Sequence, residues 1–147
     1  HPTKRVVLLG QSSFFPVCSP RLLSGQDPIR DPADLQRFNL LHEYSDETWS
    51  RWFAAAGVQD AQAVQDIFFD SAHLSLQAAR AGYGIAMGDT PTIAEDLKEG
   101  RLVRLFAEAV PAVYPYYIIT PPLDRMKPVT PIFEAWLIER FRALDGP

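Results

Sequence analysis

The sequence predicts an α/β fold in which a mostly parallel sheet is covered by helices on both faces. Short, continuously apolar runs alternate along the chain with segments of helical periodicity. Such alternation is typical of strand–helix–strand units, whose crossovers are right-handed and place helices on both sides of a sheet. Prolines also follow a capping residue at several positions, and that pair is typical of a helix start.

The proline pattern predicts the first set of helices. A capping residue precedes the proline at Ser19–Pro20, Asp31–Pro32, Thr90–Pro91 and Thr130–Pro131. The first two helices are short and run to about residues 23 and 38. The third ends at Gly100, because glycine is a common C-terminal stop, and the last runs to about Leu144.

Two further helices fill gaps between the apolar runs. The first begins at Asp46, ends at Gly57 and carries apolar side chains spaced i, i+3, i+4, i+7 at Trp49, Trp52, Phe53 and Ala56. That spacing puts the four side chains on one face of the helix, which is more typical of a hydrophobic core than of a ligand-binding site. The second covers residues 72–81, with Asp70 or Ser71 as its cap and Gly82 as its stop.

The predicted strands are the apolar runs at residues 14–17, 40–42, 67–69, 85–87, 102–106 and 116–119. Continuous apolar character over so few residues is typical of strands buried on both faces. The proline-rich stretch at residues 120–123 is the predicted boundary within the chain.

Composition and charge exclude several classes of protein. Of the 147 residues, 47% are hydrophobic and 22% charged, and the formal net charge is −4. A domain that binds nucleic acid on its own is usually basic, so this chain is not expected to bind DNA directly. The single cysteine cannot form an internal disulfide, and no apolar stretch is long enough to span a bilayer. We therefore expect a cytoplasmic protein that makes no membrane contact.

The predicted ligand site lies at the carboxyl ends of the strands, where open α/β sheets bind ligands. Three polar segments converge there, at residues 42–45, 70–73 and 88–90. Two of them are helix N-termini, whose free N–H groups and dipole favour an anion such as a carboxylate metabolite. The alternative is that Ser71 and Thr90 only cap their helices.

No combination of residues typical of a catalytic site predicts an enzyme. Cys18, His42 and His73 lie far apart in the sequence, and a buried structural cysteine is the favoured interpretation of Cys18. The sequence has neither zinc-ligand spacing nor a glycine-rich phosphate loop, so we expect no cofactor. Tyr116 and Tyr117 are strand neighbours, and only one of them can face a given cleft.

Taken together, a series of segments resembles the effector domains of LysR-type transcriptional regulators. Residues 49–57 (WSRWFAAAG) are similar to the branch that includes activators of glycine cleavage and of β-lactamase, and residues 76–86 (LQAARAGYGIA) resemble a helix–strand unit of the family. Further matching segments are residues 14–23, 31–35, 40–43, 69–71, 95–97, 100–104 and 133–137. Their order and spacing cover roughly residues 6–144.

The resemblance implies a Rossmann-like fold of the periplasmic-binding-protein type, with two α/β subdomains and a small-molecule effector in the cleft between them. It assigns residues 1–17 to a crossover strand and remnant of the first regulatory subdomain, 18–120 to the second subdomain, and 121–147 to the return segment and C-terminal helix. The effector-binding candidates are Ser71, Ala72, His73, Gly88 and Tyr116.

The resemblance also sets expectations about partners. The DNA-binding domain and most of the first subdomain are absent from the sequence, so DNA contact is expected only through the missing N-terminal domain. The apolar stripe of the last helix would be costly to expose, at about 1.5–3 kcal/mol per large side chain. A homodimer that covers this stripe, or a helix folded back on its own sheet, is therefore expected. The alternative function is a solute-binding protein of a transport system.

Overall fold

The computed structural model describes residues 3–144, and the chain divides into two compact units. Residues 13–110 form the central unit, and residues 3–12 with 111–144 form the terminal unit. The central unit holds β2 (Ser13–Cys18), α1 (Pro20–Leu23), the 3-10 helix η1 (Pro32–Arg37), β3 (Asn39–Glu43), α2 (Glu47–Ala55), β4 (Gln65–Phe69), α3 (Ala72–Arg80), β5 (Ile85–Asp89), α4 (Thr90–Lys98) and β6 (Val103–Arg104). The short strand β7 (Val110–Pro111) falls at the boundary between the two units.

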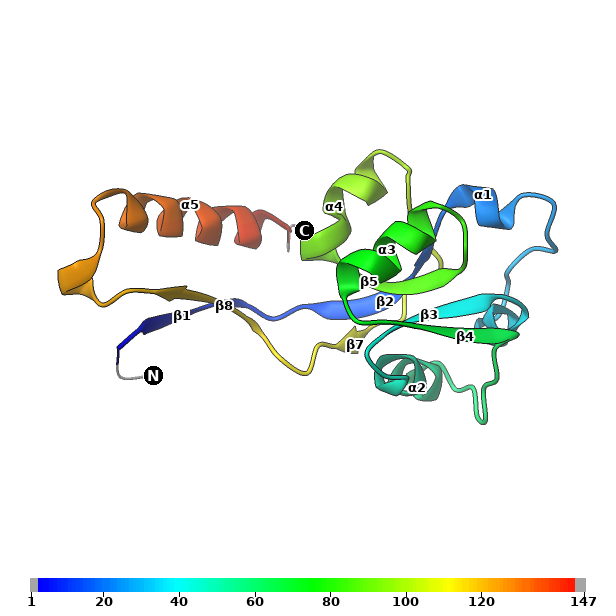
Figure 1. The fold of residues 1–147 in the computed structure, drawn as a ribbon. Helices are drawn as coiled ribbons and strands as arrows, with labels where there is room; N and C mark the ends of the chain where they lie inside the picture. The colour runs from blue at the N-terminus through cyan, green and yellow to red at the C-terminus, as the bar shows by residue number, and fades with distance from the viewer. Residues whose placement is uncertain (1–2, 145–147) are drawn as a thin grey trace. The chain divides into compact units, whose positions relative to one another are not determined.

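The central sheet confirms the predicted α/β class (Figure 1). Its strand order is β4-β3-β5-β2-β6, with β7 also paired to β2. The strand β3 pairs in parallel with β4 and β5, whereas β2 pairs antiparallel with β5 and β6. The sheet is therefore mixed and not mostly parallel. The difference arises because apolar runs specify strands but not the direction in which each strand crosses the sheet.

Alternating side chains of the strands fill a separate core on each face of this sheet. Leu40 and Ile85 belong to the core on the face of α2, where Trp49, Trp52 and Phe53 are also buried. Their neighbours Leu41 and Ala86 belong to the core that includes Leu76 of α3 and Ile93 of α4. Figure 1 shows α2 on one side of the sheet and α3 and α4 on the other. The predicted placement of helices on both faces, and of the tryptophans in the core, is confirmed.

Some of the predicted caps are confirmed and two are wrong. The side chains of Ser19, Asp31 and Ser71 each accept a backbone N–H bond at the start of a helix, and Asp31 opens a 3-10 helix and not an α-helix. Thr90 is the first residue of α4, whose N-cap is Asp89. Thr130 likewise lies inside its helix, which begins at Val129. The proline lies at the second helical position in α4 and at the third in α5, and both are tolerated because the first four N–H groups of a helix have no partner within it.

The predicted strands all form, with three differences. The strand at residues 116–119 leaves Tyr117 and Ile119 52% and 61% exposed, so it is not buried on both faces. The last strand of the central unit shortens from residues 102–106 to Val103–Arg104. The strand β4 lies at the edge of the sheet, and its Phe68 side chain is 55% exposed. The prediction that this strand is buried on both faces is wrong, because an apolar run has the same periodicity at an edge as in the centre of a sheet.

The terminal unit is a two-stranded ribbon packed against one helix. Strand β1 (Arg5–Gly10) pairs antiparallel with β8 (Tyr116–Thr120), and the 3-10 helix η2 (Leu123–Arg125) leads into α5 (Val129–Leu144). Phe141 of α5 is buried against the ribbon, with its ring 5.4 Å from that of Tyr116, and Arg5 forms an ion pair with Glu134. The helix thus folds back on its own two-stranded ribbon, which is one of the two arrangements expected from its apolar stripe. Among residues 3–144, no helix is long and apolar enough to cross a membrane.

Candidate functional site

The carboxyl ends of β3, β4 and β5 lie at one edge of the central sheet, because both β4 and β5 pair in parallel with β3. The edge carries Glu43 at the end of β3, Asp70 just after β4 and Asp89 at the end of β5. Ser71 then opens α3. The structure therefore brings together the ends of the three segments that the sequence predicts to converge.

The first turn of α3 uses two different side chains to bind its free N–H groups. The Oγ atom of Ser71 accepts the N–H of Leu74 at 3.3 Å, which confirms Ser71 as the helix cap. The N–H of Ala72 donates to the carboxylate of Glu43 from the neighbouring strand. One of the amides predicted to bind an anion is thus already bonded to an acidic side chain of the protein itself.

The acidic group at this helix end titrates abnormally. Partial burial raises the pKa of Glu43, which stays accessible to solvent, above its ordinary value, and the nearby charge of Asp89 raises it further. The hydrogen bond from Ala72 acts in the opposite direction but does not cancel these effects. Glu43 therefore takes up a proton at a higher pH than a free glutamate, and it then no longer carries the negative charge that the helix end favours.

The remaining predicted site residues lie in different environments. His73 is exposed on the first turn of α3. Gly88 is buried in β5, and a Cβ atom there would lie 2.8 Å from the Cδ1 atom of Ile93, so glycine is needed for α4 to pack closely. Tyr116 belongs to the terminal unit, where its ring packs against Phe141.

Tyr44 belongs to the predicted segment 42–45, but the sequence does not indicate its unusual backbone conformation. It follows Glu43 directly, its φ angle is +61°, and its side chain is 71% exposed. A left-handed conformation is strained for a bulky residue and is a feature that clusters at functional sites. Its own N–H is fixed by a 2.8 Å bond to the carbonyl oxygen of Phe69.

The free space inside this edge is small. A cavity of about 20 Å³ lies among Phe14, Leu41, Glu43, Ser75 and their neighbours. That volume is enough for a single water molecule. The central unit alone therefore offers an open edge at this place and no closed pocket for a metabolite.

Cys18 has the properties of a structural residue. Its side chain is fully buried at the end of β2, and burial raises the pKa of its thiol to about 12. The thiol stays protonated at neutral pH, whereas a cysteine nucleophile must be a thiolate. The interpretation of Cys18 as a buried structural residue is confirmed.

Comparison with known proteins gives consistent matches over nearly the whole chain. A family model described as the LysR substrate binding domain matches residues 1–142. The chain is 28% identical over 142 residues to the glycine cleavage system transcriptional activator of Escherichia coli, and the match covers 97% of this chain and 47% of that protein. It is 30% identical over 135 residues to the transcriptional activator AmpR of Enterobacter cloacae, covering 91% of this chain and 45% of that protein. The chain thus spans about half the length of these relatives.

Solved structures give the same result for the fold. The effector binding domain of AmpR from Citrobacter freundii superposes with a TM-score of 0.77 at 27% identity, over 95% of this chain and 68% of that one. The effector domain of AmpR from Pseudomonas aeruginosa gives a TM-score of 0.74 at 26% identity, over 96% of this chain and 66% of that one.

Proposed function

The chain belongs to the LysR substrate-binding domain family, and from this premise we propose that it is the effector-sensing part of a transcriptional regulator. A small molecule binds the domain, and a DNA-binding domain outside this chain reads the resulting change in arrangement. The match to the AmpR effector binding domain carries the proposal. The relatives compared above are transcriptional activators, which favours regulation over solute transport and over catalysis. We place this function in the cytoplasm, where such a regulator meets DNA.

We further propose the predicted boundaries as the functional division of the chain. Residues 18–120 act as the second regulatory subdomain. Residues 1–17 and 121–147 act as the crossover strand, the return segment and the C-terminal helix that link it to the first. The central unit, residues 13–110, supports this division because it has its own sheet and a core on each face of it.

The proposed effector site of the central unit comprises Ser71, Ala72, His73 and Gly88. We also propose Tyr116, on the return strand of the terminal unit, as an effector-binding residue. Ser71, Ala72 and His73 open α3, where N–H groups and the helix dipole favour a negative charge, so we propose a carboxylate effector. Its carboxylate takes the place of Glu43 at the N–H of Ala72.

A substitution of Ser71 separates binding from capping. Asp, Asn and Ser cap helices about equally well, so Ser71→Asp and Ser71→Asn should each change the free energy of unfolding by less than about 0.5 kcal/mol. Only the aspartate adds a negative charge where the effector carboxylate would lie. In thermal-shift titrations with amino acids and short carboxylates, the ligand that stabilises the wild type should still stabilise Ser71→Asn. It should bind Ser71→Asp at least tenfold more weakly. Equal binding by both variants would exclude a carboxylate at this helix end.

The raised pKa of Glu43 predicts a pH dependence for the same site. Because this pKa is raised, Glu43 gains protons as pH falls through the range above its ordinary pKa, and its competition for the N–H of Ala72 weakens. The affinity for a carboxylate effector should therefore rise as the pH is lowered from 7.5 to 5.5. In Glu43→Gln the affinity should be about tenfold higher at pH 7.5 and nearly independent of pH, which calorimetry can measure. The exposed Glu95→Gln is the matched control and should behave as the wild type.

We also propose that the regulator is a homodimer that covers the outer face of α5. Ile132, Phe133 and Trp136 are between 48% and 71% exposed, and the rings of Phe133 and Trp136 stack at 5.7 Å. Large apolar side chains gathered on one surface mark an interaction site. Phe133→Glu should convert a dimer into a monomer in light-scattering chromatography, whereas Tyr83→Glu, at an exposed aromatic residue of the central unit, should not. A wild-type chain that is monomeric at all concentrations would contradict the dimer.

A further inference from the structure

A second concave site lies on the α2 face of the central sheet, and it shares no residue with the proposed effector site. Its cavity of about 600 Å³ opens between α2, the strands β3 and β4 and the loop at residues 57–63. This volume is in the range of small-molecule sites in proteins. Leu40, Trp49 and Phe53 are buried side chains that form an apolar wall of the cavity.

The polar lining of this cavity is anionic. Asp46, Asp60 and Asp66 contribute carboxylates, and no lysine or arginine is among the lining residues. Asp46 occupies the N-cap position of α2, yet within the described part of the chain its side chain accepts no capping hydrogen bond. Its exposed carboxylate therefore does not cap the helix.

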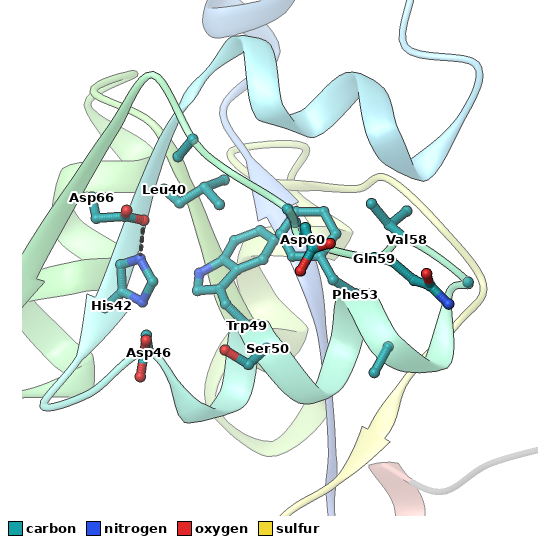
Figure 2. A pocket seen from close by; sticks show the side chains of 14 residues that line it. Leu40, His42, Asp46, Trp49, Ser50, Phe53, Val58, Gln59, Asp60 and Asp66 are labelled. Carbon is teal, nitrogen blue, oxygen red and sulfur yellow. Dashed lines mark hydrogen bonds and ion pairs between the residues drawn. The ribbon is translucent and has the colours of Figure 1, made fainter.

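His42 is the buried polar group of the site, and only one of its ring nitrogens has a partner. The Nε2 atom lies 2.7 Å from Oδ1 of Asp66, and the side chain is 2% exposed. The Nδ1 atom is buried and has no hydrogen-bond partner among the described residues. Figure 2 shows Asp66 on one side of the ring and Asp46 on the other, with the second ring nitrogen turned away from Asp66.

The pairing with Asp66 fixes the chemistry of the free nitrogen. A carboxylate accepts hydrogen bonds, so Nε2 carries the proton that it donates to Asp66. In the neutral imidazole, Nδ1 is then a bare acceptor. A buried acceptor without a donor is costly, so this position calls for a donating group, either from a water in the adjoining cavity of about 20 Å³, which His42 also lines, or from a ligand.

The surrounding side chains hold this acceptor in place. The ring of His42 stacks on that of Phe68 with centroids 4.5 Å apart. The indole N–H of Trp49 donates to the carbonyl oxygen of Leu41 at 3.0 Å, which fixes the wall of the cavity beside it. A site whose side chains are already locked loses little freedom when a ligand binds.

We propose that this cavity binds an organic ammonium ion with an apolar body. The ammonium group donates one hydrogen bond to Nδ1 of His42 and another to the carboxylate of Asp46. The apolar body lies against Leu40, Trp49 and Phe53. The anionic lining excludes carboxylates, so the cavity and the proposed effector site select ligands of opposite charge.

The test is equilibrium binding to the 147-residue chain with three probes of similar shape. Phenethylamine should bind saturably, whereas 2-phenylethanol should bind at least tenfold more weakly and 3-phenylpropionate should not bind to this cavity. Absence of saturable phenethylamine binding, or binding of all three probes with equal affinity, would overturn the proposal.

Paired variants locate the binding. Asp46→Asn and His42→Phe should each weaken phenethylamine binding at least tenfold, and Phe preserves the ring that stacks on Phe68. Asp27→Asn makes the same chemical change as Asp46→Asn at an exposed position outside both the lining and the proposed effector site, and it should leave the affinity unchanged. Asp46 is exposed, so its variant keeps the test valid even where His42→Phe does not fold. Phenethylamine binding that Asp46→Asn leaves unaltered would refute the site.

Discussion

Replacing Trp52 with alanine is expected to lower the free energy of unfolding by about 3–5 kcal/mol, the range for removing a large aromatic side chain from a core. Trp52 is 0% exposed, and its ring packs against those of Trp49, Phe53 and Phe106 at centroid distances between 5.4 and 6.1 Å. Its indole N–H also donates to the carbonyl oxygen of Glu108 at 3.0 Å. The substitution therefore empties the centre of the α2-side core and removes a link to the segment that follows β6.

The matched control is Tyr83→Ala, because Tyr83 lies in the same central unit and is 68% exposed. Both variants lose a large aromatic side chain, so the difference between them mainly measures burial. For a domain of this size we expect Trp52→Ala to lower the Tm by about 6–20 °C, and Tyr83→Ala by no more than about 4 °C. Urea and thermal unfolding followed by circular dichroism give both values. Equal losses in the two variants would show that the α2-side core is not packed as described.

Asp96→Asn is expected to lower the free energy of unfolding by about 2–4 kcal/mol, because it removes the shared partner of two arginines. The Asp96 side chain is 6% exposed, and its oxygens accept from Arg80 at 2.6 and 3.0 Å and from Arg101 at 2.7 Å. These arginines join α3 and the end of α4 through one carboxylate. Glu99→Gln is the control, since Glu99 pairs with the same Arg101 at the surface and should contribute less than about 0.5 kcal/mol.

The same ion pair predicts how stability depends on pH. The hydrogen bonds from Arg80, and to a smaller extent from Arg101, hold the pKa of Asp96 below its ordinary value. The stabilisation is therefore complete above the unfolded-state pKa of about 4 and is lost as pH falls through the lower folded-state pKa. The stability difference between wild type and Asp96→Asn should be constant from pH 7 to 5 and should shrink below pH 4. A difference that stays constant down to pH 3 would mean that Asp96 contributes nothing through its charge.

Local sequence signals predicted the elements that depend on local chemistry. Ser19, Asp31 and Ser71 cap helices because each accepts an N–H bond from a residue two or three positions ahead, which is visible in the sequence. The spacing of Trp49, Trp52 and Phe53 predicted a buried helix face in the same way. The prediction that Thr90 is a helix cap was wrong because proline fits either of the first two helical positions. A proline in the sequence therefore defines the position of the cap only to within one residue.

Properties that depend on the arrangement of strands could not be predicted from the sequence. The direction of β2, the edge position of β4 and the exposure of Phe68 depend on which strands become neighbours. The bond between Glu43 and the N–H of Ala72 joins residues that only the parallel pairing of β3 and β4 brings together. The pairing of His42 with Asp66 depends on the same register.

The edge position of β4 has a consequence for the behaviour of this protein in concentrated solution. One side of β4 pairs with β3, and as the terminal strand of the sheet it presents its other backbone edge outward. Such an edge is a template for pairing between molecules, and charged side chains on it are a common defence against aggregation. Asp66 is the charged residue within the otherwise β-prone stretch from Gln65 to Phe69. We therefore expect the carboxylate that orients His42 also to oppose pairing between the β4 edges of separate molecules.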